Sequence, residues 1–311
     1  MDPRDKPFGG LAPADARLLA GIGPAWASDI NQHRDLVIRT YSPVVAAADN
    51  AGVAVTRDIA YGAHARQVLD LFLPPTPARG PGQRGDVVLF VHGGAFIRGK
   101  KSGNGHIYDN VCYWFARQGL TALNVEHRLA QDAPYPGGAE DVARAADWAA
   151  RELRQHGVAV RRIFLVGHSA GGTHVATCLF DPGFQARPQA DIAGVVLVSA
   201  RLKADVLPGN PNAEGVRAYF GNDAALYERR SPLTHADRCD VPLLIAIAEH
   251  ENPYLDLYGA EFFQRASAAR ARKPRFVQLM QHNHTSIVAH FNSGEETLGR
   301  EILDFIAQLP S

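Results

Sequence analysis

The sequence predicts one α/β domain with a mostly parallel central sheet and helices on both of its faces. Short apolar runs of strand length alternate with stretches of helical spacing from about residue 85 to the C-terminus. These runs are apolar on both faces, as strands are when helices cover a parallel sheet on each side. No linker rich in proline and glycine divides the alternation, so we expect a single domain over residues 1–311.

The composition excludes several classes of protein. The 311 residues are 46% hydrophobic and 21% charged, which is close to the average for globular proteins. Lys+Arg and Asp+Glu both number 32, so we expect neither a nucleic-acid partner nor attraction to an anionic membrane. No stretch approaches the roughly 18 apolar residues of a membrane span. Residues 1–7 carry charge and proline where a signal peptide has an apolar run, so we expect a soluble, cytoplasmic protein.

The first fifty residues are predicted to be helical. Apolar residues recur at helical spacing over 14–26 and 30–48, and we expect Gly21, Gly23 and Pro43 to break these helices. The pattern then changes to strands.

An antiparallel hairpin is predicted next, followed by alternating strands and helices. Residues 53–59 and 67–73 are rich in β-forming residues and flank a turn at 61–63. Further strands are expected at 87–91, 121–125, 163–166, 195–198, 243–248 and 276–279. Helices are expected at 107–118, 140–154, 169–179, 257–271 and 295–308.

The three cysteines do not suggest a disulfide framework. Cys112, Cys178 and Cys239 are odd in number and far apart, and no CxxC pair indicates zinc. We therefore expect buried thiols in a reducing compartment.

The strongest functional signal is the motif GHSAG at residues 167–171. It follows a predicted strand and precedes a predicted helix, which is the context that a G-x-S-x-G nucleophile elbow requires. Such a turn holds the serine in a strained backbone conformation, and glycine on either side permits close approach of the chain. We therefore predict Ser169 as a nucleophile. An ordinary glycine-rich turn is the alternative.

A second motif, HGGAF at residues 92–96, follows the predicted strand 87–91. Acyl transfer develops an oxyanion that needs preorganised N–H donors, and adjacent glycines leave backbone amides unobstructed. The amides of Gly93 and Gly94, with that of Ala170 after the nucleophile, are predicted to form an oxyanion hole. His92 is expected to brace the loop through hydrogen bonds.

With these motifs the chain resembles the hormone-sensitive-lipase-like carboxylesterases of the α/β-hydrolase superfamily. HGGA and GHSAG match that group's HGGG/A and GxSAG patterns, and residues 124–130 (NVEHRLA) are similar to its N-Y-R-L-A-P segment. His127 stands where tyrosine is usual. The resemblance covers residues 53–308 and implies an α/β-hydrolase fold. It also implies that residues 1–50 form a cap over the mouth of the site, with Trp26, His33 and Tyr41 as candidate lining residues.

The resemblance also supplies the other two members of a catalytic triad, whose chain order in this fold is serine, acid, histidine. The segment AEHEN at 248–252 is similar to the family's A-E-Y-D-P segment, which places the acid at Glu251. Glu249 and Asp256 are the alternatives, as surface or loop carboxylates. In the loop at 281–286 the family pattern indicates His284 as the base.

Other candidate residues have weaker signals. His282 and His284 form an H-x-H pair that suggests a metal site, although no third ligand stands at a recognisable spacing. Phe96, Asn104 and Tyr254 are candidates for substrate binding, and Arg201 is expected to be solvated.

The function predicted from this set is a serine hydrolase that cleaves carboxylic esters of small soluble substrates, with no metal or organic cofactor. An arylformamidase, or another amide or carbamate hydrolase, would use the same triad. Some members of this superfamily are hormone receptors that have lost the catalytic histidine, so a receptor is a further alternative. A lipase acting at oil interfaces is disfavoured because no long apolar lid is visible. A homodimer through a sheet edge or the C-terminal helix, common among relatives, stays open.

Overall fold

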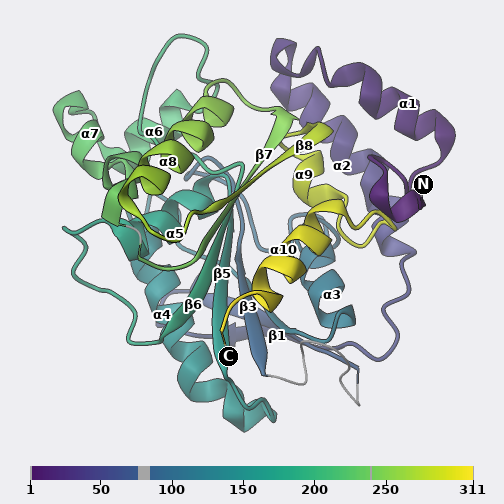
Figure 1. The fold of residues 1–311 in the computed structure, drawn as a ribbon, viewed down its shortest axis with the longest axis horizontal. Helices are drawn as coiled ribbons and strands as arrows, with labels where there is room; N and C mark the ends of the chain where they lie inside the picture. Colours follow the sequence, from purple (N-terminus) through teal and green to yellow (C-terminus); the bar gives the residue numbers. More distant parts are fainter. Residues whose placement is uncertain (1, 76–84, 239, 311) are drawn as a thin grey trace.

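The computed structural model describes residues 2–75, 85–238 and 240–310 (Figure 1). The described residues form one eight-stranded sheet in the order β1-β2-β4-β3-β5-β6-β7-β8. Strand β2 is antiparallel to both of its neighbours, and the remaining neighbouring pairs are parallel. The predicted hairpin and the mostly parallel sheet are therefore confirmed. The strands are β1 (Ala54–Ala60), β2 (Val68–Leu73), β3 (Asp86–Val91), β4 (Thr121–Val125), β5 (Arg162–His168), β6 (Ile192–Val198), β7 (Leu243–His250) and β8 (Arg275–Asn283).

Helices cover both faces of this sheet (Figure 1). Side chains of α4, α5 and α8 pack in one apolar cluster with one face of the strands, and those of α3, α9 and α10 pack in a second cluster on the other face. The bounds are α3 (Asp109–Arg117), α4 (Gly137–Glu152), α5 (Ala170–Phe180), α8 (Leu255–Ala269), α9 (Ser286–Ala289) and α10 (Thr297–Ala307).

Some boundaries differ from the predicted ones for local reasons. Helix α2 (Ile30–Ala46) continues through Pro43, because burial of Val45 in the N-terminal cluster holds the last turn although proline removes one backbone donor. Helix α1 (Pro13–Ile22) ends earlier than expected, and Trp26–Ser28 forms a separate 3-10 turn. Helices α6 (Ala213–Phe220) and α7 (Tyr227–Arg230), between β6 and β7, were not predicted, since they are too short to show a clear apolar period.

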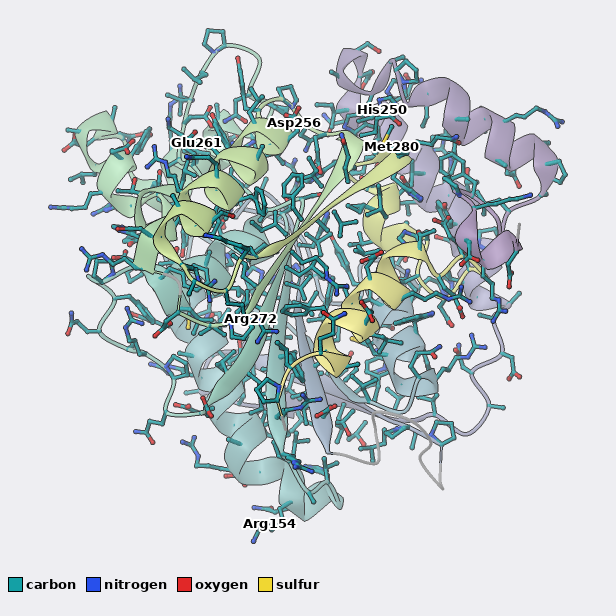
Figure 2. All side chains as sticks on the ribbon, in the orientation of Figure 1. Arg154, His250, Asp256, Glu261, Arg272 and Met280 are labelled. Carbon is teal, nitrogen blue, oxygen red and sulfur yellow. The ribbon has the colours of Figure 1, made fainter. Side chains whose placement is uncertain are left out.

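The topology brings two loops together at the carboxyl ends of the strands. Strand β3 lies between β4 and β5, so the chain leaves β3 toward one side and returns on the other. The crevice at such a switch point is the usual ligand site of an open parallel sheet. The loop 92–96 follows β3 and Ser169 follows β5 at this crevice. Figure 2 shows His250 and Asp256 at this end of the molecule and Arg154 at the opposite end.

The N-terminal segment packs beside this end of the sheet (Figure 1). It has its own apolar cluster, which includes Trp26, Val37 and Tyr41 and is completed by Ile107 and Ala289 from the core. Among the described residues no helix is both long and apolar enough to cross a bilayer. The thiols of Cys112 and Cys178 are buried and unpaired, and Cys239 lies outside the described residues.

Candidate active site

Ser169 stands in a strained turn between β5 and α5. Its backbone has φ 55° and ψ −119°, a conformation that a non-glycine residue adopts only when its surroundings enforce it. The flanking glycines explain why the turn is possible. A Cβ on Gly171 would lie 2.2 Å from the carbonyl oxygen of Val91, and one on Gly167 would lie 2.7 Å from that of Gly171. Only glycine fits at either position, so the motif GHSAG has a steric basis.

The structure brings Ser169, His284 and Glu251 into one hydrogen-bonded series. His284 Nε2 lies 3.1 Å from Ser169 Oγ, and His284 Nδ1 lies 2.7 Å from Glu251 Oε2. A carboxylate only accepts hydrogen bonds, so His284 carries its proton on Nδ1 and leaves Nε2 free to accept from the serine hydroxyl. All three side chains are less than a tenth exposed.

Glu251 is held in place by further donors. Its Oε1 accepts hydrogen bonds from the Ser199 hydroxyl and, at 2.9 Å, from the backbone N–H of Ala248. Glu249 instead accepts the backbone N–H of Gln281, and Asp256 lies in the first turn of α8. Of the three carboxylates considered from the sequence, Glu251 is the one in contact with His284.

A second hydrogen-bonded series supports the backbone of the histidine loop. His168 Nε2 donates to the carbonyl oxygen of His284 at 3.0 Å, and the Tyr108 hydroxyl lies 3.3 Å from His168 Nδ1. Burial, with a further contribution from His284, holds the pKa of His168 well below its usual value. His168 is therefore neutral, with its proton on Nε2, and Nδ1 accepts from Tyr108.

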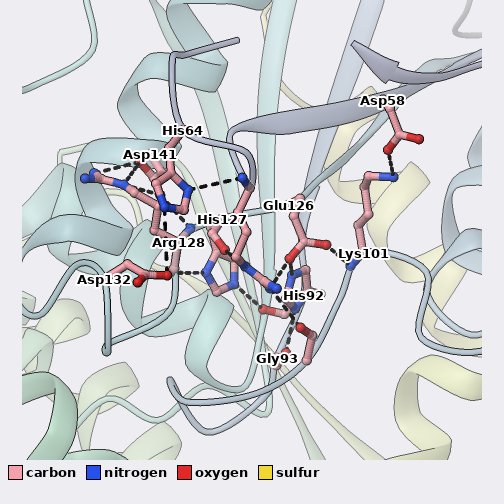
Figure 3. Close-up of polar contacts among 12 residues, drawn as sticks. Asp58, His64, His92, Gly93, Lys101, Glu126, His127, Arg128, Asp132 and Asp141 are labelled. Carbon is pink, nitrogen blue, oxygen red and sulfur yellow. Dashed lines mark hydrogen bonds and ion pairs between the residues drawn. The ribbon is translucent and has the colours of Figure 1, made fainter. Parts of the chain in front are cut away.

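The loop after β3 is fixed by a buried carboxylate (Figure 3). Glu126 accepts hydrogen bonds from the backbone N–H of Lys101 and from His92 Nε2, and it pairs with Arg66. Its pKa is lowered to about 2, since these partners outweigh the effect of burial. His92 Nδ1 in turn lies 2.6 Å from the carbonyl oxygen of Gly93. The glycines of the loop are thus held rigidly beside Ser169.

The three residues predicted to supply oxyanion amides lie near the serine. A Cβ on Gly93 would lie only 2.9 Å from Ser169 Cβ, so the backbone of the loop approaches the nucleophile closely. Gly94 lines the same cavity as Ser169, and Ala170 is the first residue of α5, where the backbone N–H has no partner within the helix. The pKa of Tyr108 is raised to about 12 by burial, against the opposing effect of the Gly93 N–H that faces its hydroxyl.

Ser169 and His284 open into a cavity of about 280 Å³. Its apolar wall is formed by Trp26, Ile30, Ile38, Ile107 and Val288, so helix α2 and the 3-10 turn before it line part of the site. Two hydrogen bonds tie the N-terminal segment across this cavity. Trp26 Nε1 donates to Asn252 Oδ1 at 2.9 Å, and Asn104 Nδ2 donates to Ser42 Oγ at 2.7 Å.

The candidate substrate-binding residues are placed differently from one another. Asn104 lines the cavity. Phe96 does not, because its ring is buried and stacks on Tyr219 with ring centroids 4.8 Å apart. Tyr254 is also outside the lining, since its hydroxyl donates to the carbonyl oxygen of Pro208. Phe96 and Tyr254 therefore do not line the cavity that contains Ser169 and His284.

Of the three residues predicted to line the site from the cap, only one lies in the described cavity lining. Trp26 lines the cavity, whereas Tyr41 is fully buried in the N-terminal cluster and His33 contacts the carbonyl oxygen of Trp26.

One group of side chains has the composition of a metal site. His282, His290 and Glu295 are buried and place their ligand atoms within 4.8 Å of one another. His282 Nε2 already hydrogen-bonds to Glu295 Oε1 at 2.8 Å, and the backbone N–H of Phe8 donates to Glu295 Oε2. His284 points to Ser169 and Glu251 instead, so the structure does not bring the H-x-H pair together as ligands. The group that includes His290 and Glu295 was missed from the sequence because its members are not regularly spaced.

Sequence reasoning also missed three arginine positions. Arg34 and Arg98 line the cavity. The only sequence signal for Arg98 is its place four residues after Gly94. Arg201, expected to be solvated, is only 2% exposed and pairs with Asp205 at 3.0 Å. Local sequence could not indicate this burial, because it depends on Tyr258 of α8 and the loop that follows β6.

The chain is similar in sequence to several known proteins. The BD-FAE family matches residues 69–180, which include β3, the loop 92–96 and the motif GHSAG. The rice (Oryza sativa subsp. japonica) gibberellin receptor GID1 is 31% identical over 195 residues, which cover 60% of this chain and 49% of the receptor. Esterase LipI of Mycobacterium tuberculosis is 38% identical over 111 residues, 34% of this chain and 32% of LipI. Mouse (Mus musculus) hormone-sensitive lipase is 31% identical over 102 residues, 33% of this chain and 13% of the lipase. The chain thus spans half or less of the length of these relatives.

Solved structures share the fold over nearly the whole chain. A bacterial heroin esterase superposes with a TM-score of 0.70 at 22% identity, covering 98% of this chain and all of the esterase. Esterase B from Lactobacillus rhamnosis superposes with a TM-score of 0.66 at 18% identity, covering 95% and 96% of the two chains. The sheet order and these solved structures show an α/β-hydrolase fold, and the sequences to which the chain is similar include hormone-sensitive lipase and GID1.

Proposed function

We propose that the protein is a serine hydrolase of carboxylic esters, with Ser169 as nucleophile, His284 as general base and acid, and Glu251 as the carboxylate that orients His284. The observation that carries this proposal is the continuous series from Ser169 Oγ through His284 to Glu251, at 3.1 Å and 2.7 Å. Hydrogen-bond reach between nucleophile, base and orienting acid is the geometric signature of an activated serine.

The reaction proceeds in two halves. Ser169 Oγ attacks the ester carbonyl carbon while its proton passes to His284 Nε2, and Glu251 stabilises the resulting imidazolium. The tetrahedral intermediate collapses when His284 protonates the departing alcohol, which leaves an acyl group on Ser169. Water then attacks the acyl-enzyme with His284 again as base, and the acid is released. The reaction requires no metal or organic cofactor.

The oxyanion of each tetrahedral intermediate is bound by the amides of Gly93, Gly94 and Ala170 in this proposal. In support, Gly94 lines the cavity, Gly93 is in close contact with the serine, and Ala170 follows the serine as the first residue of α5. A substrate oxyanion would compete with the Tyr108 hydroxyl for the Gly93 N–H. Removing a single donor of this kind typically costs about 100- to 1,000-fold in turnover.

Two other functions use the same fold. An amide, formamide or carbamate hydrolase would need the same nucleophile, base and oxyanion donors, so only substrates can distinguish it from an esterase. A ligand-binding receptor is suggested by the similarity to GID1. The His284–Ser169 contact favours catalysis over the receptor function, because pure ligand binding does not require a base at the serine.

We propose further that residues 1–50 act as a cap on a catalytic core at residues 53–308. Trp26, Ile30 and Ile38 form part of the cavity wall, so the segment shapes the space that a substrate would occupy. The alternative is a packing appendage that only stabilises the domain.

The test is hydrolysis of p-nitrophenyl acetate, butyrate, octanoate and laurate by the wild type and by Ser169→Ala. We expect turnover that falls by at least about 1,000-fold in the variant and is fastest for the shorter esters. If the wild type hydrolyses none of the four esters faster than Ser169→Ala does, the esterase proposal is overturned. Formamide hydrolysis and ligand binding are then the functions to test.

A further inference from the structure

The cavity at Ser169 contains two arginines. Arg34 belongs to α2, and Arg98 follows the loop 92–96, so the two cations come from different segments of the chain. The described lining contains no aspartate and no glutamate. Its other polar side chains include the amides of Asn31, Asn104 and Asn212. The cavity beside the nucleophile is therefore positively charged, although the chain as a whole is neutral.

Arg98 has no carboxylate within ion-pair distance among the described residues. Its one side-chain hydrogen bond runs from Nη2 to Asn212 Oδ1, at 3.2 Å. Glu214, exposed on α6, interacts with it only from a distance. Arg98 is an exposed residue whose guanidinium is partly shielded from solvent, and this partial desolvation, with a further contribution from Arg34, lowers its pKa. Arginine nevertheless stays protonated in proteins, so the site holds a cation that an incoming anion would stabilise.

Arg34, in contrast, has a carboxylate partner. It forms an ion pair with Asp35 at 2.8 Å and donates to Asn31 Oδ1 at 2.9 Å. Arg98 is therefore the one arginine of the described lining that has no carboxylate partner among the described residues. A single negative charge complements this better than a dianion such as a phosphate monoester, which would leave one charge without a partner.

We propose that the natural substrate is an ester that carries a carboxylate, which Arg98 binds in a charge-assisted hydrogen bond while the ester carbonyl lies at Ser169. This inference rests on the function proposed above and specifies its substrate class. The apolar side chains of Ile30, Ile38 and Ile107 suit a short hydrocarbon spacer between the two groups. Such a carboxylate stands either on the acyl part, as in a half-ester of a dicarboxylic acid, or on the alcohol part.

Matched pairs of esters that differ only in charge test this proposal. For the acyl side, the mono-p-nitrophenyl esters of adipic and suberic acid are compared with their methyl-capped neutral counterparts. For the alcohol side, 4-acetoxybenzoate is compared with methyl 4-acetoxybenzoate. The measured quantity is the ratio of kcat/KM for the charged ester to that for the neutral one, after subtraction of the rate with Ser169→Ala.

The variants are Arg98→Gln and a matched control, Arg39→Gln. Arg39 is exposed on the same helix as Arg34 and lies outside the cavity lining. In at least one pair we expect the wild type to prefer the charged ester by about tenfold or more, the range of a hydrogen bond to a charged group. Arg98→Gln should lose this preference, whereas Arg39→Gln should keep it. The pair that shows it identifies the acyl or the alcohol part as the carrier of the carboxylate.

A binding measurement separates failure of this inference from failure of the proposed reaction. Monomethyl adipate, a monoanion, is titrated calorimetrically into Ser169→Ala with and without Arg98→Gln. Binding that weakens about tenfold with Arg98→Gln supports the anion site even if no ester is hydrolysed. If neutral esters are hydrolysed through Ser169 without preference for the charged partners, and monomethyl adipate does not bind, the substrate class is wrong while the esterase proposal stands.

Discussion

His168 Nε2 donates a hydrogen bond to the backbone carbonyl of His284, at 3.0 Å. His168 immediately precedes Ser169, so this bond connects the nucleophile turn directly to the loop that carries the proposed base. The Tyr108 hydroxyl completes the series on the other side of the imidazole. The distance between Ser169 Oγ and His284 Nε2 is thus set by the backbone of both loops as well as by the side chains.

The first prediction concerns this connection. His168→Phe removes the N–H donor while keeping a planar ring, so we expect the His284 loop to shift and kcat to fall by about 10- to 100-fold, with KM changing much less. His168→Asn retains an N–H donor and should recover part of the loss. Steady-state kinetics of the three proteins decide the matter. Equal kcat for His168→Phe and wild type would show that the bond does not position the base.

The second prediction concerns the orienting acid. Glu251→Gln replaces a carboxylate that only accepts with an amide that can donate to His284 Nδ1, which favours the wrong tautomer. We expect kcat to fall by about 1,000-fold or more, by analogy with triads in general. Glu249→Gln is the matched control and should leave kcat near that of wild type. Comparable losses in the two variants would contradict the assignment of Glu251.

The residues of this series could be predicted because their signals are local. GHSAG and HGGAF are short motifs at the ends of apolar strands, and the resemblance to the hormone-sensitive-lipase-like esterases indicated Glu251 and His284. The structure brings these residues within hydrogen-bond distance. The sheet was predictable for the same reason, since each central strand is a continuous apolar run.

The rest of the site depends on contacts between distant segments. Trp26 reaches the cavity by bonding to Asn252, 226 residues later in the chain. Phe96 is adjacent to the oxyanion loop in sequence but turns into a cluster with Tyr219 of α6, a helix that was not predicted. Arg98 lines the cavity, where its guanidinium donates a hydrogen bond to Asn212, more than a hundred residues later in the chain. No periodicity or motif encodes such pairings.

The third prediction tests the role of the N-terminal segment. Trp26→Phe keeps the apolar ring but removes the Nε1–H donor to Asn252 Oδ1, so the segment should be held less firmly over the cavity. We expect about 1 kcal/mol of lost stability, the usual value of one buried hydrogen bond, together with a changed ratio of rates on butyrate and octanoate esters. Thermal unfolding and the ester series measure the two effects. A stability loss with unchanged chain-length preference would support the packing appendage instead of the cap.

The fourth prediction concerns stability in acid. Burial lowers the pKa of His290 to about 4, although Glu295 opposes the shift. Between about pH 6.5 and pH 4, this histidine is therefore protonated in the unfolded chain and neutral in the folded chain. The free energy of unfolding should accordingly fall as the pH is lowered through this window.

His290→Phe isolates this contribution. In denaturant titrations across the window, the free energy of unfolding of the variant should fall by about 3 kcal/mol less than that of wild type, because folding lowers the pKa of His290 from 6.5 to about 4. Parallel curves for the two proteins would contradict the buried neutral state of His290.

The central claim is that Ser169 is the nucleophile, and covalent trapping tests it most directly. Diethyl p-nitrophenyl phosphate phosphorylates an activated serine with release of p-nitrophenol, and the adduct resists hydrolysis. We predict that wild type gains a single diethylphosphoryl group by intact mass, that peptide mapping places it on Ser169, and that hydrolysis of p-nitrophenyl butyrate is lost in parallel. Ser169→Ala should gain none. Labelling of Ser169→Ala to the same extent, or an adduct mapped to another residue, would contradict the account.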